Sequence, residues 1–195
     1  MTLTHWLIVA NVLGFLLSLN AVETMFTLFA LWPPGQSGAP PFMPWQLVSY
    51  SFLHGGAGHL FFNMFALWMF GGDLERLWGP RRFAIVYFAS VLAGALAQLA
   101  IGQLSGGPAV PVVGASGGVF GLLLAFAMVF PERRVMLLIP PIPMPARVFV
   151  TLYGLLELVL GVTGTQAGVA HFAHLGGMLG GWLAMRLLFP RSVRR

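Results

Sequence analysis

The sequence predicts an all-α membrane protein, a bundle of six transmembrane helices in a single domain spanning residues 1–195. The first observation is composition: 58% of residues are hydrophobic, 8% are charged and the mean hydropathy is +0.86. Such a chain is too apolar to cover itself with a polar surface in water. Second, several stretches approach the roughly 20 apolar residues that cross about 30 Å of hydrocarbon. Third, no polar block is long enough for a separate soluble domain.

The expected spans follow from apolar runs bounded by Pro, Gly and Arg. The first is followed by a loop rich in Pro, Gly and aromatic residues, a composition suited to the membrane interface. The fourth has only about 15 residues, or about 22 Å, so one of its ends must stop inside the membrane. A Pro-rich linker, 140–145, precedes the fifth. The six expected spans are 4–31, 58–77, 82–104, 116–130, 147–162 and 169–189.

Topology follows from the arginines, which account for all ten basic residues and fall only in the 2–3 connection, the 4–5 connection and the C-terminal part. The positive-inside rule then places both termini in the cytoplasm. The first span lacks a basic leader and precedes further spans, so we expect it to be retained rather than cleaved. The arginines form no single basic patch with stacking aromatics, so no nucleic-acid partner is expected. Cysteine is absent, which excludes disulfides and thiolate sites.

Ser116 opens the fourth span within the glycine-rich stretch 114–121, so topology places it toward the outer face. Serine is a weak nucleophile that needs a base within hydrogen-bond reach and donors for the oxyanion that its attack creates. Read alone, a serine among glycines is more often a packing residue of membrane helices. Its function therefore depends on which polar residues lie at the same depth.

His174 in the sixth span is the candidate base. Gly177 and Gly181 are four residues apart, which gives a stripe of small residues along which another helix can approach closely. If the fourth span lies there, the imidazole and the Ser116 hydroxyl can meet. An ionisable residue in a membrane marks function by default, although a histidine can also simply join helices by hydrogen bonds.

The second span supplies donors. His59 and Asn63 are four residues apart, hence on one helical face, and both can donate hydrogen bonds while neutral. With the Ser116 backbone N–H at an unsatisfied helix N-terminus they suit an oxyanion hole. The alternative is a polar clamp between helices, and the pair alone does not decide between the two. His54 is expected to be structural in the preceding loop.

Between Trp45 and Trp182 the chain resembles the rhomboid family of intramembrane serine proteases. Each motif is weak alone, but the three occur in the family's order. They are His59-x-x-x-Asn63, Gly114-x-Ser116-Gly117 and Ala173-His174-x-x-Gly177-x-x-x-Gly181.

The resemblance implies that Ser116 is the nucleophile and His174 the general base and later acid, in a dyad without an aspartate. It implies that His59, Asn63 and the Ser116 amide stabilise the oxyanion, that Phe120 stacks on the His174 ring, and that Gly114 and Gly117 support the serine. His171 shares a face with His174, and spacing alone does not say which is the base. The glycines at +3 and +7 favour His174.

Departures from the family pattern and the acidic residues leave some roles open. The first outer loop has no arginine, in contrast to the Trp-Arg dipeptide of many relatives, so its anchoring is not predicted. A carboxylate-oriented triad would have to use Glu23 or Glu157. For Glu157 we favour a structural or hydration role, since intramembrane carboxylates usually pair locally. Glu75 and Arg76 resemble a structural family pattern at the cytoplasmic end of the second span.

These observations predict an endopeptidase that cleaves a peptide bond in or near the transmembrane segment of a single-span or polytopic membrane protein. By resemblance the residue before the scissile bond is small and the substrate enters laterally past the fifth span. No metal or cofactor is implied, because the His-Glu-x-x-His pattern is missing and one aspartate cannot form an aspartyl dyad.

One alternative is a proteolytically inactive relative that binds membrane segments. The other is a small transporter that relays protons, but the sequence shows no internal repeat of the kind that transporters usually have. The expected location is a bacterial cytoplasmic (inner) membrane, with the site open toward the outer face. Natural substrate and oligomeric state are not predicted.

Overall fold

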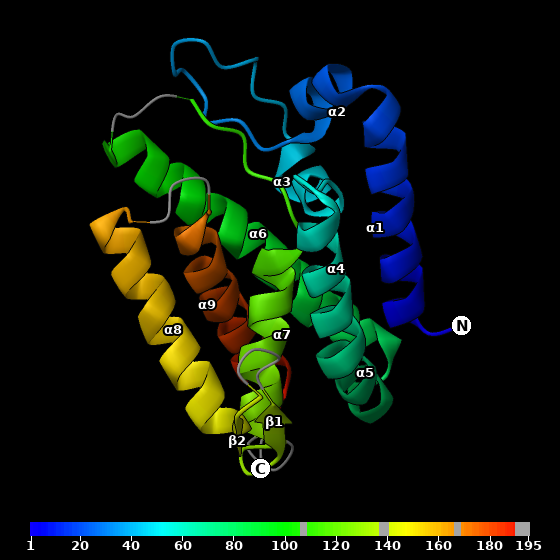
Figure 1. Cartoon of the computed structure of the whole chain (residues 1–195). Helices are drawn as coiled ribbons and strands as arrows, with labels where there is room; N and C mark the ends of the chain where they lie inside the picture. The colour runs from blue at the N-terminus through cyan, green and yellow to red at the C-terminus, as the bar shows by residue number, and fades with distance from the viewer. Residues whose placement is uncertain (106–108, 137–140, 166–168, 190–195) are drawn as a thin grey trace.

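The structure is a computed structural model that describes residues 1–105, 109–136, 141–165 and 169–189, and it is built almost entirely of helices (Figure 1). The helices are α1 Leu3–Asn20, α2 Val22–Phe29, α3 Gln46–Ser49, the 3₁₀ turn η1 Tyr50–Phe52, α4 Ala57–Ala66, the π-helical η2 Leu67–Gly71, α5 Gly72–Trp78, α6 Pro80–Ser105, α7 Ser116–Val129, α8 Ala146–Thr163 and α9 His171–Leu188. Two short antiparallel strands, β1 Arg134–Met136 and β2 Pro143–Pro145, join α7 to α8.

Expected spans and observed helices correspond closely in the second half of the chain. The spans 82–104, 116–130, 147–162 and 169–189 match α6, α7, α8 and α9 to within two residues at each end. Within the described residues α1, α6 and α8 are long and apolar enough to cross a membrane, and α7 is a shorter apolar helix. The second expected span, 58–77, is α4, η2 and α5 in succession. The protein is thus a helical integral membrane protein.

The first expected span, 4–31, is two helices rather than one. α1 ends at Asn20, Ala21 adopts φ −148° and ψ 50°, and α2 begins at Val22. The Ser18 hydroxyl donates to Phe15 O at 2.7 Å, a local side-chain bond that competes with helix continuation. Eighteen residues of α1 span about 27 Å, enough for most of a bilayer core without α2.

The α1 N-terminus is held by a carboxylate from α5. Glu75 accepts hydrogen bonds from Leu3 N at 2.7 Å, Thr4 N at 2.8 Å and the Thr4 hydroxyl at 2.7 Å. These amides are among the donors that a helix start leaves unsatisfied, and a negative charge there also complements the helix dipole. The contact fixes α1 beside α5, 71 residues further along the chain.

The segment between α2 and α4 is anchored by uncharged side chains. Trp45 Nε1 donates to Leu28 O at 2.9 Å, and the Ser49 hydroxyl donates to Phe29 O at 2.8 Å. Leu31 and Val112 exchange two backbone hydrogen bonds of 3.0 Å each. The loop between the first two expected spans is therefore tied to the chain just before Ser116 by uncharged groups, without an arginine.

Helix α9 packs against α6, α7 and α8, with α4 and then α1 on the far side of α7 (Figure 1). Two adjacent glycine stripes make this possible. A Cβ atom at Gly180 would lie 2.5 Å from Ala93 Cβ of α6, whereas one at Gly177 would lie 2.0 Å from Gly117 O of α7. Since Gly176 also faces α6 and Gly181 faces α7, α9 approaches two helices closely at once.

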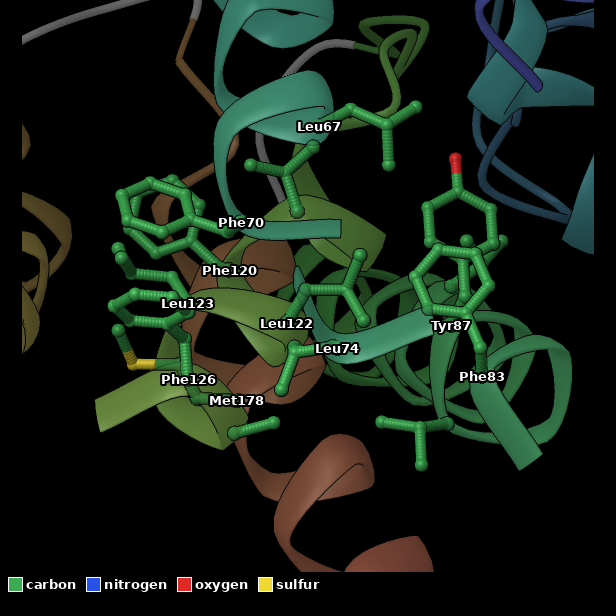
Figure 2. Packing of buried hydrophobic residues seen from close by; sticks show 14 of the residues in the cluster. Leu67, Phe70, Leu74, Phe83, Tyr87, Phe120, Leu122, Leu123, Phe126 and Met178 are labelled. Atoms are coloured by element: carbon green, nitrogen blue, oxygen red, sulfur yellow. The ribbon is translucent and has the colours of Figure 1, made fainter. Parts of the chain in front are cut away.

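The apolar core lies between α4–α5, α6 and α7, as Figure 2 shows for Leu67, Phe70, Leu122 and Phe126. Phe70 and Phe126 meet edge to face with ring centroids 5.1 Å apart. Many large apolar side chains remain exposed on the outer faces of α1 and α8, among them Leu13, Leu17, Leu152, Leu155 and Val159. Helix faces that expose apolar side chains along their whole length are suited to contact with lipid rather than water.

The hairpin β1–β2 replaces part of the linker that the sequence predicts as loop. Val135 pairs with Met144 and is buried. Pro140, the first residue of the predicted linker, falls outside the described residues. In Figure 1 the hairpin lies at the same end of the molecule as α5, so the arginines of the 2–3 and 4–5 connections share one end. Arg191, Arg194 and Arg195 fall outside the described residues.

Candidate active site

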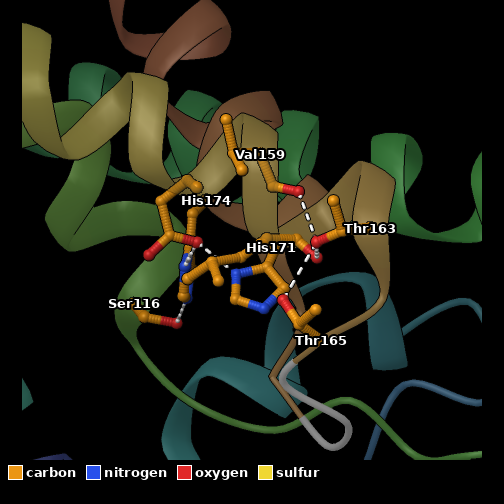
Figure 3. Close-up of polar contacts among 8 residues, drawn as sticks. Ser116, Val159, Thr163, Thr165, His171 and His174 are labelled. Atoms are coloured by element: carbon orange, nitrogen blue, oxygen red, sulfur yellow. Dashed lines mark hydrogen bonds and ion pairs between the residues drawn. The ribbon is translucent and has the colours of Figure 1, made fainter.

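Ser116 and His174 lie within hydrogen-bond distance of each other. Ser116 is the first residue of α7, His174 lies in the first turn of α9, and Ser116 Oγ is 2.8 Å from His174 Nε2 (Figure 3). The two residues are 58 positions apart in the chain. A hydroxyl that donates to the unprotonated Nε2 of an imidazole is the arrangement that activates a serine for nucleophilic attack.

The close approach of α7 and α9 produces this contact. Gly177 is three residues after His174 and Gly117 directly follows Ser116, and a Cβ at Gly177 would lie 2.0 Å from Gly117 O. One turn further on, a Cβ at Gly181 would lie 2.9 Å from Gly121 Cα. Any side chain at these positions would separate the helices and, with them, the hydroxyl and the imidazole.

Gly114 shapes the approach of the chain to Ser116. It has a backbone φ of +123°, which residues with a side chain rarely adopt, and its N–H donates to Tyr50 O at 3.0 Å. A Cβ there would lie 2.7 Å from His59 Cε1 and 2.8 Å from His59 Nε2. Glycine thus allows the His59 ring to rest against the backbone two residues before Ser116.

His59 and Asn63 line the same cavity as Ser116 and His174. The Asn63 amide donates to His59 O at 2.9 Å and is buried, with a second N–H still to donate. Among the hydrogen bonds of the described residues, neither side chain bonds to Ser116 Oγ. Among the described residues, no side chain caps the α7 N-terminus, where the Ser116 amide lies. These groups therefore surround the serine without occupying its hydroxyl.

Phe120 stacks on the His174 ring, with centroids 4.2 Å apart and planes inclined by 4°. Phe120 also stacks against Tyr153 of α8 with centroids 5.4 Å apart, and Tyr153 in turn stacks on Phe149 at 5.4 Å. The imidazole plane is thus fixed by an aromatic stack that runs from α9 through α7 to α8.

Glu157 of α8 also reaches the site, which the sequence did not favour. Its Oε2 is 2.8 Å from His174 Nδ1 and 2.6 Å from His171 Nδ1, and all three side chains are buried. Glu23, the other carboxylate considered, is exposed on α2. The signal present in the sequence was a lone acidic residue in one span and two histidines in the next, and an intramembrane charge needs such partners.

The structure separates the two histidines of α9 by their contacts. His174 bonds to Ser116 through Nε2 and to Glu157 through Nδ1. His171 bonds to Glu157 only, and its buried Nε2 has no partner among the described residues. Figure 3 shows Ser116 beside His174, with His171 further from the serine.

A cavity of about 770 Å³ opens beside Ser116 between α4, α7 and α8. Its polar lining residues include His59, Asn63, Ser116 and His174, together with Gln98 and Tyr153, and apolar side chains such as Phe62 and Phe149 form much of the rest. A mostly apolar cavity with a few convergent polar groups is the usual form of a binding site. Its size suits several residues of an extended peptide.

His54, expected to be structural, lies buried behind His59. The two rings meet edge to face with centroids 5.0 Å apart, and neither His54 nitrogen has a partner among the described residues. Burial, and to a smaller extent the charge of His59, lowers the pKa of His54 to about 3. His54 is therefore neutral at pH 7 and supports the His59 ring from behind.

Comparison with known proteins agrees with the resemblance. Residues 41–191 match the Rhomboid domain. Over 144 residues the chain is 31% identical to "Rhomboid protease GluP" of Bacillus subtilis (strain 168), covering 74% of this chain and 26% of that protein. It is 33% identical over 162 residues to "Rhomboid protein 1, mitochondrial" of Saccharomyces cerevisiae, covering 77% and 44%.

A third relative, "Putative rhomboid protease YdcA" of Bacillus subtilis, is 28% identical over 151 residues, covering 77% of this chain and 70% of that protein. The chain thus spans about a quarter of the first relative and less than half of the second. Because the Rhomboid domain accounts for most of its length, the chain belongs to the rhomboid family.

Proposed function

We propose that this protein is an intramembrane serine endopeptidase that uses Ser116 as nucleophile and His174 as general base. The observation that carries the proposal is the 2.8 Å contact between Ser116 Oγ and His174 Nε2 at the wall of a 770 Å³ cavity. Several relatives are named proteases, which supports the same reaction class. Retention of both residues argues against a relative that only binds membrane segments.

The chemistry follows from the two contacts of the imidazole. His174 Nε2 takes the Ser116 proton as Oγ attacks the scissile carbonyl, and the resulting imidazolium then protonates the leaving amine. The products are an acyl-enzyme that carries the N-terminal part of the substrate as an ester on Ser116, and a free C-terminal fragment with a new amino terminus. Water, deprotonated by the same Nε2, then hydrolyses the ester and restores Ser116.

The oxyanion of each tetrahedral intermediate needs donors opposite the imidazole. The Ser116 backbone N–H at the α7 start, the His59 ring and the free N–H of Asn63 are the candidates, since all three border the same cavity. Donors that are fixed before the reaction cost no reorganisation when the charge develops. His59 is held for this task between His54 and the Gly114 backbone.

The membrane setting determines which substrates reach the site. We place six spans across a bacterial cytoplasmic membrane, with the arginine-rich end in the cytoplasm and the Ser116 end toward the outer face. Water enters from that face through the polar part of the cavity. A membrane-protein substrate must unwind a helical segment to expose its carbonyl, so helix-weakening residues near the scissile bond favour cleavage, with a small residue preceding that bond by resemblance to the family.

Cleavage of a single-span model substrate in proteoliposomes tests the proposal. Wild-type protein should cleave it, whereas Ser116→Ala and His174→Ala should each lower the rate by at least about 1,000-fold. Matched controls are Ser18→Ala, whose hydroxyl donates to Phe15 O within α1, and His5→Ala, which changes an exposed residue. Full cleavage by Ser116→Ala would refute the proposal, and binding without cleavage by the wild type would favour a membrane-segment binding protein.

A further inference from the structure

A carboxylate touches the far side of the proposed base. Glu157 Oε2 lies 2.8 Å from His174 Nδ1, while Nε2 of the same ring lies 2.8 Å from Ser116 Oγ. Ser116, His174 and Glu157 therefore form one continuous chain of hydrogen bonds. They come from three different helices, α7, α9 and α8.

This contact dictates the tautomer of His174. A carboxylate oxygen only accepts hydrogen bonds, so Nδ1 must carry the proton that it donates to Glu157. Nε2 then has its lone pair free to accept the Ser116 proton, which is the form a general base requires. The opposite tautomer would place two lone pairs against each other at 2.8 Å and would leave the serine without a base.

His171 makes a buried charge on Glu157 tolerable. Its Nδ1 lies 2.6 Å from the same Oε2, so the carboxylate oxygen accepts from two imidazoles. A buried ion that lacks such donors carries a large desolvation cost. Among the described residues, the ionisable neighbours of Glu157 are His171 and His174 from α9 and Tyr153 one turn earlier on α8.

The distances fit hydrogen bonds rather than a metal centre. Two ligands of one tetrahedral zinc ion, each about 2.1 Å from it, lie about 3.4 Å apart. The Glu157 oxygen lies only 2.6 Å and 2.8 Å from the two imidazole nitrogens. The three side chains would have to move apart to admit an ion.

We propose that Glu157 is a positioning residue for the protease reaction, held by His171, which fixes the tautomer and orientation of His174 and stabilises the imidazolium that forms during catalysis. The inference rests on the proposed function and departs from the dyad that resemblance to the family implies. Glu157 does not touch the substrate; its effect reaches the reacting atoms through His174.

Glu157→Gln isolates the charge. An amide oxygen can accept both hydrogen bonds in the same place, so the packing is kept while the negative charge is lost. We expect kcat to fall about 100-fold with KM unchanged, because the imidazolium of the transition state loses its counter-charge. Glu157→Asp keeps the charge but moves it back by one methylene, so its kcat should be about tenfold higher than that of Glu157→Gln and still about tenfold below wild type.

The readouts are kcat and KM for the proteoliposome cleavage, the rate at which a fluorophosphonate labels Ser116, and the melting temperature. Labelling should slow by a factor similar to the loss in kcat, since it needs an activated serine but no peptide. The matched control is Thr151→Val on α8, whose hydroxyl donates to Arg147 O and makes no other hydrogen bond within the described residues. It should leave all three unchanged. EDTA should leave wild-type kcat unchanged.

Folded Glu157→Gln with wild-type kcat, or with a change confined to KM, would overturn the inference. A kcat that EDTA abolishes and zinc restores would also overturn it. Should Glu157→Gln fail to fold, Glu157→Asp decides, with an unchanged kcat counting against the positioning role. An inactive wild type would instead refute the proposed function, and a Ser116-dependent activity indifferent to Glu157 would refute only this inference.

Discussion

Gly177→Ala tests whether glycine packing between α7 and α9 creates the active site. A Cβ at position 177 would lie 2.0 Å from Gly117 O and 2.7 Å from Gly117 C, both of them backbone atoms. A rotamer change cannot relieve this overlap, because no flexible side chain is involved. The two helices must therefore move apart where they carry Ser116 and His174.

The required movement can be worked from these distances. An ordinary contact begins at 3.4 Å, so the methyl group pushes α7 and α9 apart by about 1.4 Å at this level. Ser116 Oγ and His174 Nε2 are 2.8 Å apart. Even half of the 1.4 Å displacement, added to this distance, would break the hydrogen bond between them. Misplacement by about 1 Å costs about 100-fold in rate, and overpacking costs about 1–3 kcal/mol of stability.

The assay is the proteoliposome cleavage rate, together with the melting temperature in detergent. Gly72→Ala is the matched control, since a Cβ at Gly72 in α5 meets nothing within 4 Å. It should leave activity unchanged and raise stability by about 0.5–1 kcal/mol. A Gly177→Ala protein with activity within twofold of wild type would refute the reasoning that ties helix spacing to catalysis.

Two further predictions concern stability. Glu75→Gln weakens the charged cap on α1 and should lower the free energy of unfolding by about 1–3 kcal/mol in denaturant titrations. The control Glu132→Gln removes an exposed ion pair and should change the free energy of unfolding by less than about 0.5 kcal/mol. Equal effects of the two substitutions would contradict the capping role. Because the pKa of His54 is about 3 when folded and about 6.5 when unfolded, the unfolded state alone gains its proton as pH falls. Stability should therefore drop by about 2 kcal/mol between pH 7 and pH 5, and His54→Phe should remove this part of the pH dependence in thermal melts.

The later helices were predictable from the sequence because apolar runs are bounded there by residues with strong local preferences. Pro80 begins α6, and Gly164 with φ +64° follows α8. The approach of α9 to α7 was predictable from Gly177 and Gly181, since only small residues allow that contact. The second stripe, in which Gly176 and Gly180 pack against α6, lies in the same stretch of sequence but was not predicted.

What the sequence did not predict depends on contacts between distant segments. The break at Ala21 interrupts an apolar run that hydropathy cannot divide, and the hairpin β1–β2 forms across a Pro-rich segment with no strand pattern. The contact of Glu157 with His174 spans two helices, so spacing within either helix is silent about it. Such a buried charge could be recognised from sequence only as needing some partner.

Mass-spectrometric mapping of a fluorophosphonate adduct tests most directly that Ser116 is a nucleophile activated by His174. We predict a single adduct on the peptide containing Ser116 in the wild type, abolished by Ser116→Ala and slowed at least about 100-fold by His174→Ala in protein that still melts cooperatively. An adduct on another residue, or Ser116 labelling at the wild-type rate in folded His174→Ala, would contradict it.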